Sequence, residues 1–126
     1  MFCNPPYGSA IRAWVPKIRA EAEAGATIVA LLPGQRFEQP YWQVNLFDPT
    51  ITRAIVAIKG RLQFIAANGV PADGNPYGSF LYLLGPGHDQ AAALETFRDL
   101  GLVFTLGKVA QYAPALPLFG RKPAAG

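Results

Sequence analysis

The sequence predicts an α/β protein built around one core, and three observations lead to this fold class. The chain has 126 residues, of which 51% are hydrophobic and 15% are charged, a balance typical of a folded domain. Continuous apolar, β-branched runs suit strands that are buried on both faces of a sheet. Amphipathic stretches that suit helices lie between these runs, and such alternation favours a largely parallel sheet.

The elements are expected in this order: a strand over 1–3, a loop over 4–15, a helix over 16–24, a strand over 27–34, a short helix over 41–47, extended segments over 54–58 and 62–65, a loop over 66–78, a strand over 79–84, a helix over 89–100 and a strand over 102–106. The clearest strands are TIVALLPG at 27–34 and SFLYLL at 79–84, because both are continuous apolar runs. The run AIVAI at 54–58 is similar and leads into a Lys-Gly turn.

Prolines and glycines predict the ends of the helices. Pro16 would interrupt a helix that began near Ser9, so the first helix is expected to start with this proline and to stop at Gly25. Residues 1–112 are expected to form one domain, and the proline-containing stretch 113–126 is expected to be a poorly ordered tail.

The first strand is short for a strand inside a sheet. Strands average about five or six residues, whereas the loop begins directly after Cys3. We therefore expect a partial sheet that lacks its N-terminal strands.

Composition excludes several classes of protein. Cys3 is the only cysteine, which excludes a disulfide framework, and with His88 it provides too few ligands for zinc, so no metal site is expected. No apolar run reaches the roughly 18 residues that a membrane span needs. The formal charge of +3 and the pI of about 9.2 permit a polyanionic partner without demanding one.

The segment Asn4-Pro5-Pro6-Tyr7 directly after a buried strand carries the strongest chemical signal. The amide oxygen of Asn4 and the backbone carbonyl of Pro5 can each accept a hydrogen from one planar NH2 group, which localises the lone pair of its nitrogen for methyl transfer. Pro6 stiffens the loop, and Tyr7 offers a face for a flipped base. The alternative is a rigid turn without chemistry, and the same tetrapeptide also suits a glutamine side chain or a guanine amine as acceptor.

The segments that follow narrow these alternatives: NPPYG, Trp14-Val15 with Lys17 two residues on, EAEAGATIVALLPG, Trp42, IKGRLQF and GSFLYLLG occur in this order. This series resembles the phage-type Dam family of DNA N6-adenine methyltransferases, over residues 2–104. The resemblance implies a class I, Rossmann-like methyltransferase sheet that uses S-adenosylmethionine. In that sheet 1–3 would end the fourth strand, and 26–32, 54–58 and 79–84 would be the fifth, sixth and seventh strands.

Carried over by residue, the resemblance implies that Asn4, Pro5 and Tyr7 bind the target adenine and that Pro6 shapes the loop. It also implies DNA as partner and the cytoplasm of a bacterium or phage-infected host as location. The glycine-rich S-adenosylmethionine loop expected upstream is absent. Gly85 and Gly87 are weak substitutes, because the strand after them brings no acid for the ribose.

A few other residues are candidates for contacts with DNA or the base. Arg36 follows a strand on the edge expected for Asn4, and Arg61 follows a turn; either arginine contacts DNA or is simply exposed. Trp42 and Trp14 either line the base pocket or belong to the core, as large aromatic residues more often do.

Three functions stay open. The first is adenine-specific DNA methylation with this chain as the target-base part. The second is a non-catalytic remnant that binds DNA or a partner. The third is methylation of a glutamine side chain or an RNA guanine through the same loop, against which the GRLQF segment argues.

Overall fold

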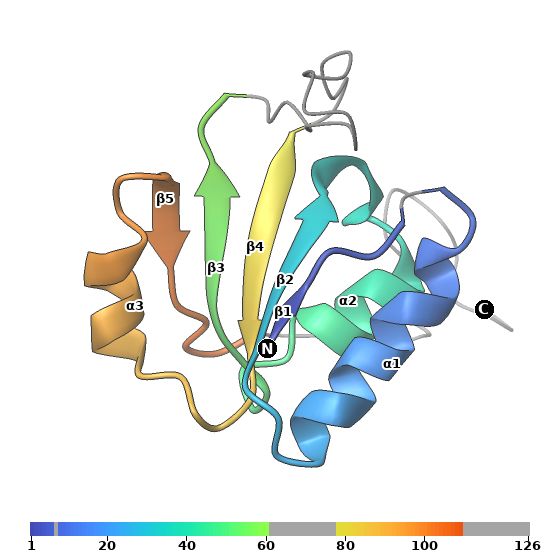
Figure 1. Cartoon of the computed structure of the whole chain (residues 1–126), viewed down its shortest axis with the longest axis horizontal. Helices are drawn as coiled ribbons and strands as arrows, with labels where there is room; N and C mark the ends of the chain where they lie inside the picture. The colour runs from blue at the N-terminus through green and yellow to red at the C-terminus, as the bar shows by residue number, and fades with distance from the viewer. Residues whose placement is uncertain (7, 61–77, 110–126) are drawn as a thin grey trace, which may run out of the picture.

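The computed structural model describes residues 1–6, 8–60 and 78–109. Its elements are β1 (Phe2–Cys3), α1 (Ile11–Glu23), β2 (Ile28–Pro33), η1 (Gly34–Arg36), α2 (Pro40–Leu46), β3 (Thr52–Ile58), β4 (Ser79–Leu84), α3 (Gln90–Thr96) and β5 (Gly101–Phe104). Helices and strands share one layered body (Figure 1), so the α/β class is confirmed. The expected extended segment at 62–65, nearly all of the loop at 66–78 and the tail at 113–126 lie outside the described residues.

The sheet order is β1-β2-β4-β3-β5. The expectation of a largely parallel sheet is wrong: in the described part β1 and β2 run parallel, and the other three neighbouring pairs are antiparallel. Strands in the middle of a sheet with two covered faces are apolar throughout whatever their direction, so the apolar runs that predicted burial carried no information about direction.

The helix α1 begins at Ile11, five residues before the proline that was expected to start it. Pro16 removes one backbone hydrogen bond, at a cost of about 3 kcal/mol. In exchange, α1 buries Ile11, Val15 and Ile18, which are at most 3% exposed, and burial of three such side chains contributes roughly 5–9 kcal/mol. Tertiary packing therefore outweighs the local effect of the proline.

The C-terminal end of α1 follows the sequence prediction. Gly25 has a φ of 108°, and its N–H donates to the carbonyl of Ala22 at 3.0 Å, while the N–H of Ala26 donates to the carbonyl of Glu21 at 3.0 Å. This pair of bonds is the usual glycine-terminated helix end.

The helix α3 is shorter than the expected helix over 89–100. Asp89 caps its first turn by accepting hydrogen bonds from the N–H groups of Ala91 and Ala92 at 2.9 and 3.2 Å. The helix ends at Thr96 and the chain then turns into β5, while Leu94 and Leu100 are each 43% exposed.

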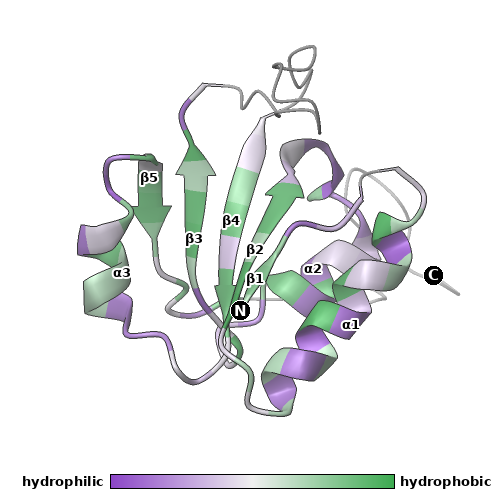
Figure 2. Ribbon diagram, viewed as in Figure 1, coloured by the Kyte–Doolittle hydropathy of each residue, from purple (hydrophilic) through white to green (hydrophobic). Residues whose placement is uncertain are grey.

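The helices α1 and α2 cover one face of the sheet. On this face Ala30, Leu32 and Tyr82 are at most 1% exposed. Figure 2 shows apolar residues along the strands and a mixture of apolar and polar residues along α1. An amphipathic helix over an apolar sheet face explains this distribution. Among the described helices, none is long and apolar enough to cross a membrane.

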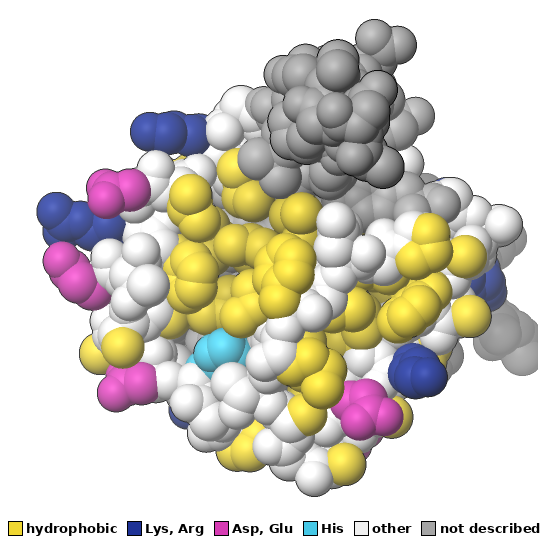
Figure 3. Space-filling view, in the orientation of Figure 1, with side chains coloured by type: hydrophobic (Ala, Val, Ile, Leu, Met, Phe, Trp, Pro, Cys, Tyr) yellow, Lys and Arg dark blue, Asp and Glu magenta, His cyan; other side chains and the backbone are white. Residues whose placement is uncertain are grey.

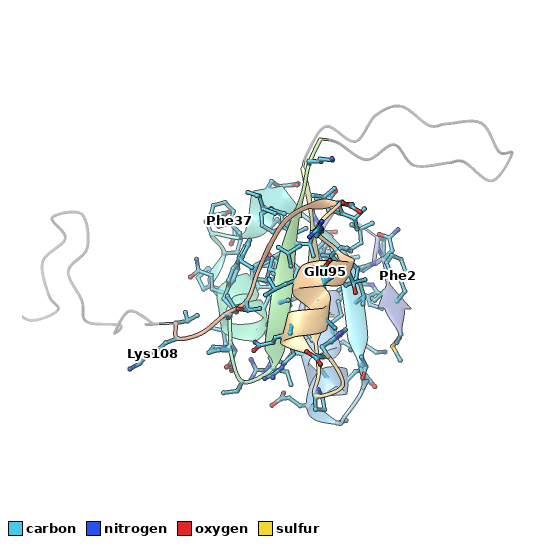
Figure 4. All side chains as sticks on the ribbon, turned by 90° about the vertical axis from the view of Figure 1, so that its left-hand side faces the viewer. Phe2, Phe37, Glu95 and Lys108 are labelled. Atoms are coloured by element: carbon cyan, nitrogen blue, oxygen red, sulfur yellow. The ribbon has the colours of Figure 1, made fainter. Side chains whose placement is uncertain are left out.

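The second face of the sheet has less cover. Among the described elements α3 packs on it, through Ala93 against a cluster that includes Leu31 and Leu81. Hydrophobic side chains gather over the middle of this face in Figure 3. Phe2, which is 64% exposed, lies on this side of the sheet, opposite Phe37 in Figure 4.

Three strands end at one edge of the sheet, which we call the carboxyl edge. β1, β2 and β3 run toward it and β4 starts from it, as the pairing of Pro33 with Ser79 shows. The N–H of Gly34 donates to the carbonyl of Gly78 at 2.8 Å and closes this edge between β2 and β4. Asn4, Pro33 and Gly60 therefore lie at one edge, as the sequence predicted (Figure 1).

Candidate functional site

The loop after β1, which we call the acceptor loop, comprises Asn4, Pro5 and Pro6 in the described residues. Parallel pairing of Cys3 with Ala30 holds its start beside the middle of β2. Pro5 is buried, whereas Asn4 and Pro6 are exposed. A buried proline anchors the loop and limits its backbone freedom, so the direction of the exposed Asn4 side chain is constrained.

The side chain of Asn4 is unengaged: within the described part of the chain it makes no hydrogen bond. Tyr7, the expected stacking face, lies outside the described residues. The far end of the loop is tied to α1, because the N–H of Ile11 donates to the carbonyl of Gly8 at 3.2 Å. Gly8 has a φ of 96°, a left-handed conformation that favours glycine at the turn into the helix.

Arg36 lies in η1, directly after β2, at the carboxyl edge where the sequence placed it. Its side chain is half-buried and makes no ion pair or hydrogen bond within the described residues. The other arginine expected near the base, Arg61, lies outside the described residues.

Trp42 is a core residue, so its expected contact with DNA is corrected. It is 0% exposed, and its indole N–H donates to the hydroxyl of Tyr82 at 2.9 Å. Burial raises the pKa of Tyr82, against a smaller lowering by this hydrogen bond, so the hydroxyl stays protonated. The helix α2 is packed against the sheet by this pair, and no face of Trp42 is open to a base.

Trp14, in contrast to Trp42, is exposed to solvent. It lies on the outer side of α1, is 37% exposed, and has the ammonium group of Lys17 at 6.0 Å from its ring centroid. The expectation that it belongs to the core is wrong. The buried stripe of α1 passes through Val15 instead, which places the preceding residue on the outside.

Gly85 and Gly87, the weak candidates for the cofactor loop, serve packing. Gly85 has a φ of 108°, and a Cβ there would collide with the carbonyl oxygen of Ala26. A Cβ at Gly87 would collide with the hydroxyl of Thr27. Both glycines let the turn after β4 lie directly against the start of β2, which explains them without a ligand.

Position also separates this turn from the acceptor loop. β4 runs antiparallel to β2, so Gly85 lies at the edge opposite the carboxyl edge. Cys3 pairs with Ala30 and Leu84 pairs with Ile28, so about four residues of β2 separate the level of Asn4 from that of Gly85, roughly 13 Å at about 3.3 Å per residue. A donor held at Gly85 and Gly87 would be far from Asn4, and these residues do not fit S-adenosylmethionine binding for this site.

Cys3 and His88 show no sign of metal chemistry. The His88 Nε2 lies 2.8 Å from the carbonyl oxygen of Ile28, and no group of three metal-binding side chains occurs in the described residues. Partial burial raises the pKa of the Cys3 thiol, so this side chain is protonated beside the acceptor loop.

Sequence reasoning missed one pair at the carboxyl edge. The guanidinium carbon of Arg12 lies 4.8 Å from the centroid of the Tyr41 ring and links the first turn of α1 to the first turn of α2. The hydroxyl oxygen of Tyr41 is buried and has no partner in the described structure. The sequence did not suggest this pair, because Pro16 led to the prediction that Arg12 lies in a loop and not in the first turn of a helix.

No family model, no curated protein and no solved structure matches this chain.

Proposed function

We propose that the protein acts in methylation of adenine N6 in DNA and that the described residues form the part that holds the target base. The observation that carries this proposal is the acceptor loop. It presents an exposed Asn4 side chain that has no hydrogen-bond partner among the described residues, next to a buried proline, at the carboxyl ends of parallel-running strands. Ligands of open α/β sheets bind at this kind of edge.

The two oxygens of the loop suit one planar amine. The side-chain oxygen of Asn4 accepts one hydrogen of the adenine amine, and the carbonyl of Pro5 accepts the other. Two acceptors withdraw the nitrogen lone pair from the ring and direct it at an incoming methyl group, which is catalysis by position and electrostatics. Tyr7, outside the described residues, is the proposed stacking face.

The sheet supports the family that the sequence resembles. The segments expected as the fourth, fifth, sixth and seventh strands of a class I methyltransferase are β1, β2, β3 and β4. All four occur in one sheet, with β4 inserted antiparallel between β2 and β3.

A second candidate is a protein that binds DNA or a partner without methylating it. The observation that favours it is the misfit of Gly85 and Gly87 with S-adenosylmethionine, which leaves no donor site assigned among the described residues. The two candidates share the acceptor loop and differ in donor binding.

Binding of the acceptor tests the shared part. Two fluorescent single-stranded oligonucleotides are compared by anisotropy, one with adenine and one with purine, which lacks only the exocyclic amine. Two hydrogen bonds at about 0.5–1.5 kcal/mol each predict binding of adenine that is about 5- to 150-fold tighter. Asn4→Ala should remove about half of this preference in free energy, because the Pro5 carbonyl stays, and Asn4→Asp should retain the preference because an acceptor oxygen stays in place.

Equal affinity for the adenine and purine oligonucleotides would contradict the proposal. A preference for a guanine oligonucleotide, or for a glutamine peptide as competitor, would favour the third acceptor class. Calorimetric titration with S-adenosylmethionine then tests the misfit of Gly85 and Gly87: no saturable heat is expected, and saturable heat would place a donor site in this chain and argue against the non-catalytic candidate.

A further inference from the structure

The helices α1 and α2 are joined by two arginines of α1, and the partners of these two arginines differ. Arg19, near the end of α1, donates to the carboxylate of Asp48 at 2.8 Å and lies 3.4 Å from the carboxylate of Glu23. It also donates to the carbonyl of Val44 at 3.1 Å. The positive charge of Arg19 is therefore paired with carboxylates of the protein itself, as expected of an arginine with a structural role.

Arg12 makes the other link, and its positive charge is not paired with a carboxylate among the described residues. Its guanidinium lies over the ring of Tyr41 at 4.8 Å, and no carboxylate or carbonyl pairs with it among the described residues. A ring face orients a guanidinium without using its N–H groups, so the donors that recognise phosphate stay available.

The ring of Tyr41 is itself held in place. It is half-buried, and it meets the core residue Trp42 edge-on, with centroids 6.3 Å apart at 76°. A fixed ring reduces the freedom that the long side chain of Arg12 would lose on binding a ligand. The pair is therefore preorganised and differs from an arginine that moves freely in solvent.

The position of Arg12 relates it to the acceptor loop. The helix α1 begins where this loop ends, and the N–H of Arg12 lies 3.4 Å from the carbonyl of Ser9. Figure 1 shows the start of α1 and the segment before α2 near the end of the sheet at which β2 and β3 point. Arg36, also unpaired in the described residues, follows β2 at the same edge. Two free guanidinium groups next to a base-binding loop suit a polymer that carries both bases and phosphates.

We propose that Arg12, oriented by Tyr41, is a phosphate-binding residue that positions the DNA backbone beside the acceptor loop. This inference rests on the proposed function, because it takes DNA as the ligand of the acceptor loop. Arg12 is a positioning residue, and it has no part in the methyl transfer itself.

The salt dependence of DNA affinity tests the proposal. Binding of the whole protein to a fluorescent DNA duplex is measured over a series of salt concentrations. Arg12→Ala should reduce the magnitude of the slope of log K against log salt by about one, and loss of one phosphate contact weakens binding about eightfold at 0.1 M salt. Arg12→Lys should retain the slope while losing part of the affinity, because the charge stays and the planar fork is lost.

Arg98→Ala is the matched control. Arg98 is exposed, lies beyond α3 and is paired with Glu95 at 3.4 Å, so its removal changes the net charge equally at a distance from the acceptor loop. The proposal expects a smaller change in slope for this variant than for Arg12→Ala. Tyr41→Leu should weaken DNA binding with the slope retained, since the charge stays but its orientation is lost.

The outcomes separate this inference from the proposed function. A wild-type slope in Arg12→Ala, an equal change in Arg98→Ala, or no binding of DNA by the wild-type protein would overturn it. The adenine preference is a separate readout, because it compares two oligonucleotides that carry the same phosphates. A lowered slope without any adenine preference would support the phosphate contact and refute the acceptor loop, and the converse result would do the reverse.

Discussion

The contact between Trp42 and Tyr82 is expected to be one of the largest single contributions to stability in this fold. Both side chains are at most 1% exposed, their polar atoms lie 2.9 Å apart, and their rings meet edge-on with centroids 6.0 Å apart. Each polar group is the partner of the other, so removal of one leaves the other buried and unsatisfied. A double-mutant cycle of Trp42→Phe and Tyr82→Phe isolates this effect.

The size of each change follows from the burial. Tyr82→Phe leaves the indole N–H without an acceptor, which costs about 1–3 kcal/mol. Trp42→Phe leaves the Tyr82 hydroxyl unsatisfied and also creates a cavity, so its cost is about 2–5 kcal/mol. In the double variant neither polar group remains, and its cost should fall below the sum of the single costs by about 2 kcal/mol.

Urea unfolding followed by far-ultraviolet circular dichroism measures these free energies at equilibrium. Single costs that add to the double cost within about 0.5 kcal/mol would refute the coupling. In the oligonucleotide assay, Trp42→Phe should keep the adenine preference under conditions in which it is folded. Loss of that preference would restore Trp42 as a base contact and overturn its placement in the core.

Two further predictions concern stability. In urea unfolding, Gly85→Ala should destabilise the protein by about 2 kcal/mol or more beyond the effect of Gly25→Ala. Both glycines have a φ of 108°, but a Cβ would meet a backbone carbonyl only at Gly85. Equal losses of unfolding free energy in the two variants would contradict the packing role of Gly85. Burial raises the pKa of Asp48, but hydrogen bonds from Thr50 and Arg19 outweigh burial and hold the pKa below its ordinary value. Asp48→Asn should therefore lower the free energy of unfolding by about 1 kcal/mol at pH 7. This difference from wild type should disappear as the pH falls below about 4 and through the lowered pKa of Asp48. A difference that is constant with pH would refute the contribution of the charge.

Local patterns in the sequence predicted several elements closely. The run SFLYLL predicted β4 with its observed bounds, and the short helix expected at 41–47 is α2 at Pro40–Leu46. Gly25 ends α1 as expected. The strand and the helix end depend on neighbouring residues alone: an unbroken apolar run, and a glycine that adopts a left-handed φ.

The placement of Asn4 at the same edge as Pro33 was also predictable. A loop that follows a strand lies at the carboxyl end of that strand, and two parallel strands share that end. The chemical types of the loop residues further suggested a planar amine as ligand. What the loop binds stays a prediction, because position and exposure alone do not specify a ligand.

Contacts between distant segments decided the rest. Pro16 lies inside α1 because packing on the sheet stabilises the turn before it. Burial of Trp42 depends on where α2 meets Tyr82, and exposure of Trp14 depends on which face of α1 packs on the sheet. The antiparallel insertion of β4, the close approach that accounts for Gly85 and the pairing of Arg12 with Tyr41 each join residues about 30 or more positions apart. The sequence by itself determined the local elements and the edge that carries the acceptor loop. The tertiary structure alone decided strand direction, burial and the free charge beside that loop, because these depend on which surfaces meet.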